Sequence, residues 1–174
     1  MNKNNNIKIY VTIAILASLA SIFSVLDKII IASLFPYIPG IKIGLANIIT
    51  LFSIYNTKFK YAFIEVIIKI VLTSFILGSL TTFIIGGISS LISFFAMYIS
   101  FRYLKTKTSI ITISVIGGFI HINCQLIITK FIYKLGDDIY MYGAVLIIIS
   151  LVMSIIVGII TNKLNKANFI SKMH

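Results

Sequence analysis

The sequence predicts an all-α integral membrane protein, built as a bundle of six transmembrane helices with both termini in the cytoplasm. Of its 174 residues, 59% are hydrophobic and 11% are charged, and the mean hydropathy is +1.10. A soluble domain carries about 25% charged residues, so this chain is too apolar to be one. Apolar stretches long enough to cross roughly 30 Å of hydrocarbon recur along the chain, and cations gather in alternate connections between them.

Six apolar stretches are interpreted as membrane spans. The second is the shortest, and two interpretations of it stay open: it extends back into residues 29–38, or it is a half-inserted helix. A polar cytoplasmic tail, residues 1–8, precedes the spans, and its Asn-rich start is expected to be disordered. A basic cytoplasmic tail, residues 163–174, follows the membrane domain of residues 9–162. The predicted spans are Ile9–Leu26, Ile41–Tyr55, Tyr61–Leu77, Thr82–Phe101, Ile110–Thr129 and Ile139–Thr161.

Lysine and arginine side chains set the predicted orientation. In the six-span arrangement one side carries ten cations and no acid, and the other carries four cations and three acids. Because cytoplasmic loops are enriched in cations, we expect the first side to be cytoplasmic. The net charge of +11 then reflects topology and attraction to membrane lipid head groups, and its spread over short loops argues against nucleic-acid binding. The ten cations are Lys3, Lys8, Lys58, Lys60, Arg102, Lys105, Lys107, Lys163, Lys166 and Lys172.

Polar side chains inside two of the spans are candidates for a ligand site. Glu65 and Lys69 are four residues apart on the third span and share a helix face. They either neutralise each other, or Glu65 lies close enough to the cytoplasmic interface to be hydrated, or Lys69 faces an internal cavity and a bound anion. His121 and Gln125 are also four residues apart, on the fifth span. They either line a ligand pocket beside the glycine pair at residues 117–118 or form a hydrogen-bonded clamp between helices.

The connection after the first span is a further candidate region. Asp27 and Lys28 are expected to end that span, and Ile29–Ile38 to form an apolar outer loop with a proline kink. We expect the loop to fold over an external pocket as a lid, with Phe35 and Tyr37 as its apolar wall. Such a lid would close a site on the outer side of the bundle.

The lid, Lys42, Asn47, His121 and Gln125 are expected to converge on one cavity that opens to the outside. At 1.5 Å per residue along the fifth span, His121 and Gln125 lie between mid-membrane and the outer face. A ligand there would be mainly apolar, with an acidic or hydrogen-bonding end toward Lys42. The alternative for Lys42 is a lysine that extends its ammonium group to the interface.

Small residues form a stripe on the first span that is either a partner-docking face or internal packing, because such stripes let helix backbones approach closely. No catalytic residue, metal site or cofactor is expected. Cys124 is the single cysteine, and only four residues are acidic. The chain contains no G-x-x-x-x-G-K-[ST] phosphate loop, so it cannot hydrolyse ATP by that route. The stripe consists of Ala14, Ala17, Ser18 and Ser21.

Four motifs resemble the Gx transporter family, also labelled heptaprenyl diphosphate synthase component I, over roughly residues 10–162. This family is grouped with the substrate-binding S components of energy-coupling factor transporters. The chain departs from the family pattern in having Ile122 directly after His121, where the family usually has Asn, and Lys69 where it often has Arg. The motifs are Pro39-Gly-Ile-Lys-Ile-Gly-Leu-Ala-Asn47, Leu77-Gly78, Gly86-Gly-Ile-Ser-Ser90 and Gly117-Gly-x-x-His121-x-x-x-Gln125.

The resemblance implies a six-helix subunit of the bacterial plasma membrane that binds a small vitamin- or cofactor-like molecule from outside. Such a subunit docks through its first helix to a transmembrane coupling protein with two ATPases. Prenyl transfer itself needs Mg²⁺ held by clustered carboxylates, so we expect no enzyme activity. Two alternatives stay open: a non-catalytic membrane subunit linked to prenyl-quinone or flavin-dependent extracellular electron transfer, and a stand-alone permease.

Overall fold

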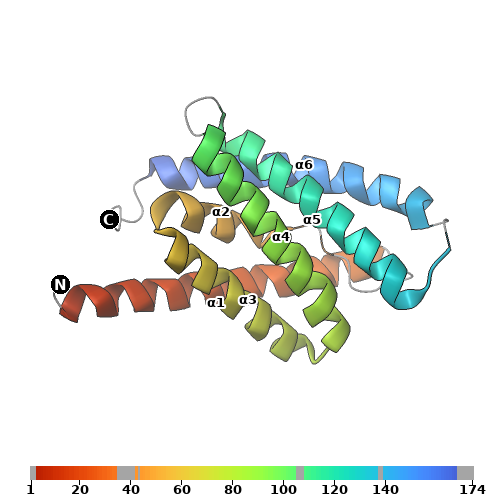
Figure 1. Ribbon diagram of the computed structural model, residues 1–174, viewed down its shortest axis with the longest axis horizontal. Helices are drawn as coiled ribbons and strands as arrows, with labels where there is room; N and C mark the ends of the chain where they lie inside the picture. Colours follow the sequence, from red (N-terminus) through yellow and green to blue (C-terminus); the bar gives the residue numbers. More distant parts are fainter. Residues whose placement is uncertain (1–2, 35–41, 43, 105–107, 137–138, 168–174) are drawn as a thin grey trace.

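The computed structural model describes residues 3–34, 42, 44–104, 108–136 and 139–167. Within these residues the chain forms six helices and no strand, which confirms the all-α prediction (Figure 1). The helices are α1 (Lys3–Leu34), α2 (Asn47–Asn56), α3 (Phe59–Leu77), α4 (Leu80–Leu104), α5 (Ile110–Tyr133) and α6 (Ile139–Lys166).

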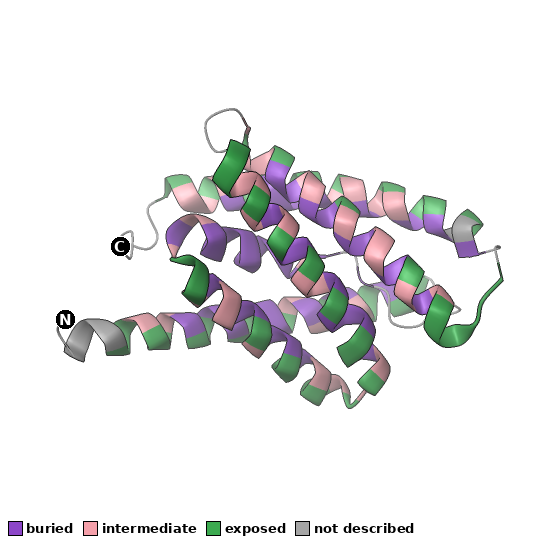
Figure 2. Cartoon of the chain, in the orientation of Figure 1, coloured by how far each residue is buried: buried purple, intermediate pink, exposed green. Residues whose placement is uncertain are grey.

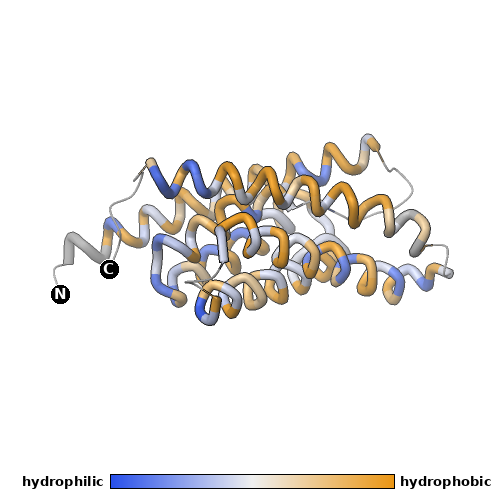
Figure 3. The backbone as a smooth tube through the Cα atoms, turned by 90° about the horizontal axis from the view of Figure 1, so that it is seen from above, coloured by the Kyte–Doolittle hydropathy of each residue, from blue (hydrophilic) through white to orange (hydrophobic). Residues whose placement is uncertain are grey.

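Four of the helices described are long and apolar enough to cross a membrane: α1, α4, α5 and α6. Figure 3 shows hydrophobic residues along most of the length of the bundle. Helix α3 has 19 residues but carries Lys60, Glu65 and Lys69. Helix α2 has 10 residues, about 15 Å, which is half of a span. Length and composition therefore make the protein a multi-pass membrane protein, with α2 as a half-length element.

Helix α2 lies at the centre of the bundle. It contacts every other helix, while α1, α3, α4, α5 and α6 pack in sequence around it, α1 against α3 and so on to α6. Figure 1 shows α1 and α3 on one side, α5 and α6 on the other, and α4 crossing between them. Nine of the ten α2 residues are buried. Figure 2 shows this helix mostly in the colour of buried residues. The short helix is thus a core element rather than a lipid-facing one.

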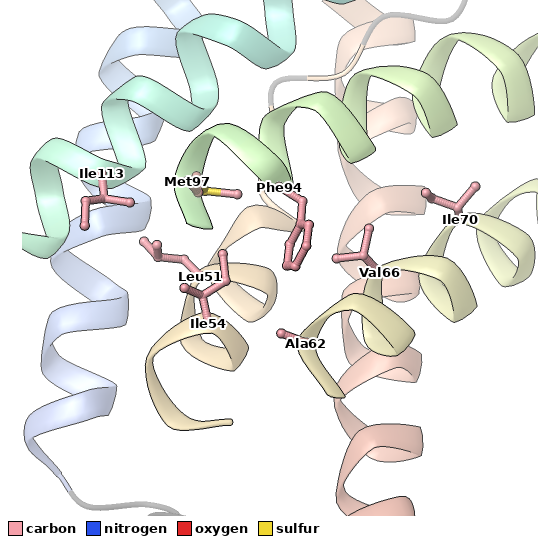
Figure 4. Packing of buried hydrophobic residues seen from close by; sticks show 8 residues of the cluster. All are labelled: Leu51, Ile54, Ala62, Val66, Ile70, Phe94, Met97 and Ile113. Carbon is pink, nitrogen blue, oxygen red and sulfur yellow. The ribbon is translucent and has the colours of Figure 1, made fainter. Parts of the chain in front are cut away.

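The C-terminal half of α2 enters an apolar core shared with α3, α4 and α5 (Figure 4). Aromatic rings extend this core, with Phe59 of α3 and Tyr98 of α4 at a centroid distance of 4.6 Å. Such ring contacts stabilise a core beyond the area that they bury. The core residues are Leu51, Ile54, Ala62, Val66, Ile70, Phe94, Met97 and Ile113.

The start and the end of α1 differ from the prediction. The helix begins at Lys3, inside the tail that was expected to be disordered, and continues to Leu34. The prediction that Asp27 and Lys28 end the first span was therefore wrong, and the first part of the expected loop, from Ile29 to Leu34, is helical. The reason is that Asp27 has hydrogen-bond donors inside the bundle, so its charge does not need the membrane surface.

The second and last helices also differ in their bounds. Helix α2 begins at Asn47 rather than Ile41, and the interpretation that this span extends back into residues 29–38 was wrong, because residues 29–34 belong to α1. Gly44 precedes it with φ of +104°, a conformation that a helix does not contain and that favours glycine. Helix α6 continues to Lys166, past the predicted end at Thr161.

The small-residue stripe of α1 is divided between the inside and the surface. Ala17 and Ser21 are buried, and the Ser21 hydroxyl donates to the backbone oxygens of Ala17 at 2.8 Å and of Lys69, on α3, at 3.5 Å. Of the two interpretations of the stripe, internal packing therefore applies to Ala17 and Ser21. Ala14 and Ser18 are exposed and remain available to a partner.

Candidate functional site

Asp27 fixes the turn that leads into α2. Its Oδ2 accepts hydrogen bonds from the backbone N–H of Gly44 at 2.6 Å and of Leu45 at 2.9 Å. A Cβ at Gly44 would lie 3.1 Å from the Asn47 amide nitrogen, so the turn also needs glycine for space. A carboxylate that accepts two backbone donors is well satisfied although buried. Residues 44–46 are thus held at the depth of Asp27 on α1.

His121 and Gln125 hold the same segment from α5. Gln125 Oε1 accepts a hydrogen bond from the backbone N–H of Lys42 at 2.9 Å. Gln125 Nε2 and His121 Nε2 lie 2.9 Å apart in a second hydrogen bond. The two side chains therefore share a face as predicted, and they form a hydrogen-bonded clamp whose other partner is the segment before α2 and not a second helix as expected. The clamp joins α5 to the segment before α2.

The Lys42 side chain is buried among α1 and α4. Its Nζ donates to Ser24 Oγ on α1 at 2.8 Å. A Cβ at Gly86 on α4 would lie 3.3 Å from that Nζ, so the missing side chain makes room for the ammonium group. Lys42 does not extend its ammonium to the interface, and that interpretation was wrong.

Lys69 and Glu65 on α3 are both buried but are not joined by a direct hydrogen bond. Lys69 Nζ donates to Thr50 Oγ1 on α2 at 3.1 Å. The Glu65 carboxylate lies near the same hydroxyl, yet neither of its oxygens accepts a well-formed hydrogen bond from the residues described. Their charges still interact, because they are close within a low-dielectric interior. The pair is therefore compensated only in part.

A small polar chamber lies between these side chains. Its volume of about 10 Å³ has room for roughly one water molecule. Ligand sites for drug-sized molecules enclose about 300 Å³ or more, so a molecule of that size requires the chamber to widen. The polar chamber is lined by Ser24, Lys42, Lys69, Ile70, Thr73, Ser74, Thr82, Gly86, Gly87 and Ser90.

The predicted site residues fall into three groups. Lys42 and Lys69 line the chamber. Asn47, His121 and Gln125 are buried beside the segment that carries Lys42, and His121 and Asn47 both lie within 4 Å of the Cβ position of Gly44. The two lid residues, Phe35 and Tyr37, lie outside the described part of the chain.

Several residues of the chamber and of the turn beside it were missed by sequence reasoning. Asp27 gave a signal, because an acid inside a continuous apolar stretch marks a functional position by default. Ser24, one turn earlier on the same face of α1, could have been found with it. Thr73 and Thr82 gave none, since hydroxyl residues are common in membrane helices and bond to their own helix.

The fold and the enclosed polar chamber define a multi-pass membrane protein whose helices bury cations at their centre. The profile of one protein family matches residues 16–164, most of the chain. The chain belongs to the heptaprenyl diphosphate synthase component I family, and the resemblance drawn from its motifs is confirmed. No curated protein and no solved structure matches the chain.

Proposed function

We propose that this protein is the substrate-binding component of an energy-coupling factor type importer, which takes up a small, largely apolar vitamin- or cofactor-like molecule. The observation that carries the proposal is the polar chamber, where two lysines are buried between helices of a membrane bundle. Ionisable residues at such depth are costly and mark substrate pathways. The family match supports the proposal, because the resemblance to this family implies a substrate-binding component of such an importer.

The proposed role is binding rather than catalysis. Prenyl transfer needs carboxylates that gather around Mg²⁺. The chain has four acidic residues in all, and Asp27 is engaged by two backbone donors while Glu65 lies on a different helix. Among the residues described, no three His, Cys, Asp or Glu side chains form a metal-binding group. In the proposal the synthase label denotes a family and not a reaction of this chain.

The proposal includes six membrane passes with α2 and its preceding segment as one of them, both termini in the cytoplasm, and a bacterial plasma membrane. The positive-inside distribution of lysines supports this orientation. Energy for transport would come from a coupling subunit with ATPases. Ala14 and Ser18, the exposed part of the α1 stripe, form the proposed contact with that subunit.

Two measurements on tagged protein from its own cells test this function. Native mass spectrometry of the detergent-purified protein should detect a co-purifying small molecule, and affinity purification should recover a membrane subunit with ATPases. Ala14→Leu should weaken recovery of these subunits and leave the bound molecule in place. Ala144→Leu on α6, also at an exposed position, is the matched control and should change neither. An empty protein that recovers no ATPase contradicts the proposal.

A second function is favoured by the small size of the chamber, which holds about one water molecule in this structure. In that case the protein is a non-catalytic subunit associated with prenyl-quinone or flavin-linked electron transfer. Affinity purification would then recover a redox or prenyl-lipid enzyme, and mass spectrometry would find no bound molecule. The two functions thus give opposite results in the same pair of measurements.

A further inference from the structure

An apolar groove follows the seam between α3 and α4. Its outer part, about 540 Å³, lies where the two helices meet at Gly78 and Leu80. Its inner part, about 250 Å³, continues along the seam toward Ile67 and Leu91. Val71 and Phe83 line both parts, which makes them one feature, called here the α3–α4 groove. Its volume is in the range of known ligand sites, and its lining is almost entirely apolar.

The α3–α4 groove and the polar chamber share a wall. Ile70 and Gly87 line the inner part of the groove and also the chamber, and Ser74 lines the outer part and the chamber. A Cβ at Gly87 would lie 3.1 Å from Ile70 Cγ2, so the wall between the two spaces is one isoleucine side chain against a glycine. A rotation of that side chain would connect them.

The chamber has the chemistry of an anion site. Two of its lining residues, Lys42 and Lys69, are cations, while the acids that interact with them, Asp27 and Glu65, lie outside the lining. Lys28 on α1 adds a nearby cation, since its Nζ donates to Thr82 Oγ1 at 3.0 Å. The Thr73 hydroxyl, 2% exposed, lines the chamber and has no hydrogen-bond partner among the residues described. A buried hydroxyl without a partner is costly, and a bound oxyanion would satisfy it.

We propose that the ligand is a single-chain amphiphile with an anionic head, whose chain lies in the α3–α4 groove and whose head occupies the polar chamber, which widens to admit the head when the Ile70 side chain rotates. This rests on the proposed function and names its substrate class. The groove supplies apolar surface open to the bilayer, and the chamber supplies charge complementarity at its inner wall. The ligand therefore reaches the chamber sideways from the membrane, between α3 and α4. Carboxylate and phosphate heads share the chemistry required.

Binding to the purified protein in lipid nanodiscs tests the proposal with three probes of equal chain length. These are a fluorescent fatty acid, a single-chain lysophosphatidic acid and an uncharged monoacylglycerol. The wild-type protein should bind at least one anionic probe about tenfold more tightly than the uncharged one. Preference for the first or second probe assigns the head as carboxylate or phosphate. Equal binding of all three overturns the proposal.

Thr73→Val separates a ligand contact from a structural role. Because the hydroxyl has no partner in the part of the chain that the structure describes, the isosteric change should leave thermal stability unchanged or raise it. The same change should weaken binding of the anionic probe by about tenfold. Thr129 on α5 is also buried without a partner among the residues described and does not line the chamber, so Thr129→Val is the matched control. Equal binding by both variants and wild type would contradict a head group at Thr73.

Val71→Trp fills the groove at its middle, where both parts meet. Val152 on α6 is similarly exposed, at 54% against 49% for Val71, and Val152→Trp is the control. Only Val71→Trp should reduce binding, by tenfold or more. If no amphiphile binds while another molecule co-purifies with the protein, the substrate class is wrong and the proposed function stands. If the amphiphile binds as expected but no ATPase-linked subunit is recovered, the importer role fails instead.

Discussion

The α5–α6 interface and the polar chamber both lie inside the bundle, but they use small and hydroxyl residues in opposite ways. At the interface, a Cβ at Gly158 would lie 2.7 Å from the Ile111 backbone, and the Ser114 hydroxyl donates to the Ser154 carbonyl at 2.6 Å. At the chamber, Gly86 leaves room for an ammonium group, and the Thr73 hydroxyl has no partner among the residues described. At the interface, glycine lets two helices approach closely, whereas at the chamber it leaves space for a lysine side chain.

This difference separates residues that hold the fold from residues that are free to bind. Where backbones touch and hydroxyls are satisfied, helices associate by packing and hydrogen bonds, which is how membrane helices are held together. Where polar groups are enclosed without partners, stability is lost unless something else satisfies them. Changes at the interface should therefore lower stability, and changes at the chamber should lower binding.

The largest expected effect is an all-or-none difference in cysteine labelling between the two ends of the bundle. This difference shows which end of each region faces the cytoplasm. In a Cys124→Ala background, Lys58→Cys and Lys163→Cys should resist an impermeant thiol reagent in intact cells, because both lie on the expected cytoplasmic side. Lys134→Cys should react. All three lysines are exposed, so burial does not account for the pattern. Labelling of Lys58→Cys by the impermeant reagent in intact cells would contradict the six-pass arrangement.

Gly158→Leu should disrupt the α5–α6 interface. The new side chain meets Ile111 and Ser114 at distances that force the helices apart, and overpacking of this kind costs about 3 kcal/mol. Thermal unfolding in detergent measures the loss. Val152→Leu, at an exposed position of the same helix, should leave the unfolding temperature close to that of the wild type. A stable Gly158→Leu variant would mean that the interface is looser than the structure has it.

Asp27→Asn should weaken the turn before α2. The charge that accepts the Gly44 and Leu45 amides is lost, and hydrogen bonds to a charged group contribute about 1.5–3 kcal/mol. Stability in detergent should fall by about 2 kcal/mol. The control is Ser33→Ala on the same helix, since among the residues described the Ser33 hydroxyl bonds to the Ile29 carbonyl one turn earlier. Equal stability of the two variants would show that Asp27 does not stabilise the turn before α2.

Ser114→Ala should have the smallest effect. It removes one hydrogen bond between α5 and α6, and such bonds contribute about 0.6 kcal/mol in membrane bundles. Chemical or thermal unfolding of the wild type and of Ser114→Ala measures this difference in stability. Binding of an anionic probe should not change, because Ser114 does not line the chamber. A loss of binding in Ser114→Ala would contradict the claim that the interface contributes to stability and the chamber to binding.

The sequence predicted the longer helices because their apolar stretches end at charges or glycine. Gly78, with φ of +55°, closes α3 at Leu77 as expected. The charge of Asp27 led to the wrong prediction that the first span ends there. Its hydrogen-bond partners are residues 44 and 45, which the sequence around Asp27 does not indicate. The end of a helix can be read from nearby residues only when its charges are satisfied by water or by the helix itself.

The candidate site was predictable where spacing alone decides the geometry. His121 and Gln125 share a face because they are four residues apart, and they are bonded in the structure. The hydrogen bond from the Lys42 backbone to Gln125 joins residues 83 positions apart, which no periodicity could indicate. The position of Thr73 in the chamber likewise depends on how α1, α3 and α4 meet. Helix faces follow from sequence spacing, but the choice of faces that meet follows from tertiary packing.

The central claim is that the chamber around Lys42 binds the ligand, and Lys42→Met tests it most directly. The variant keeps the backbone N–H that donates to Gln125 and removes only the ammonium group that donates to Ser24. Native mass spectrometry should find the co-purifying ligand on the wild type and on Lys42→Arg, which keeps the charge, and should find it absent from a folded Lys42→Met protein. Full ligand occupancy in folded Lys42→Met would contradict the claim.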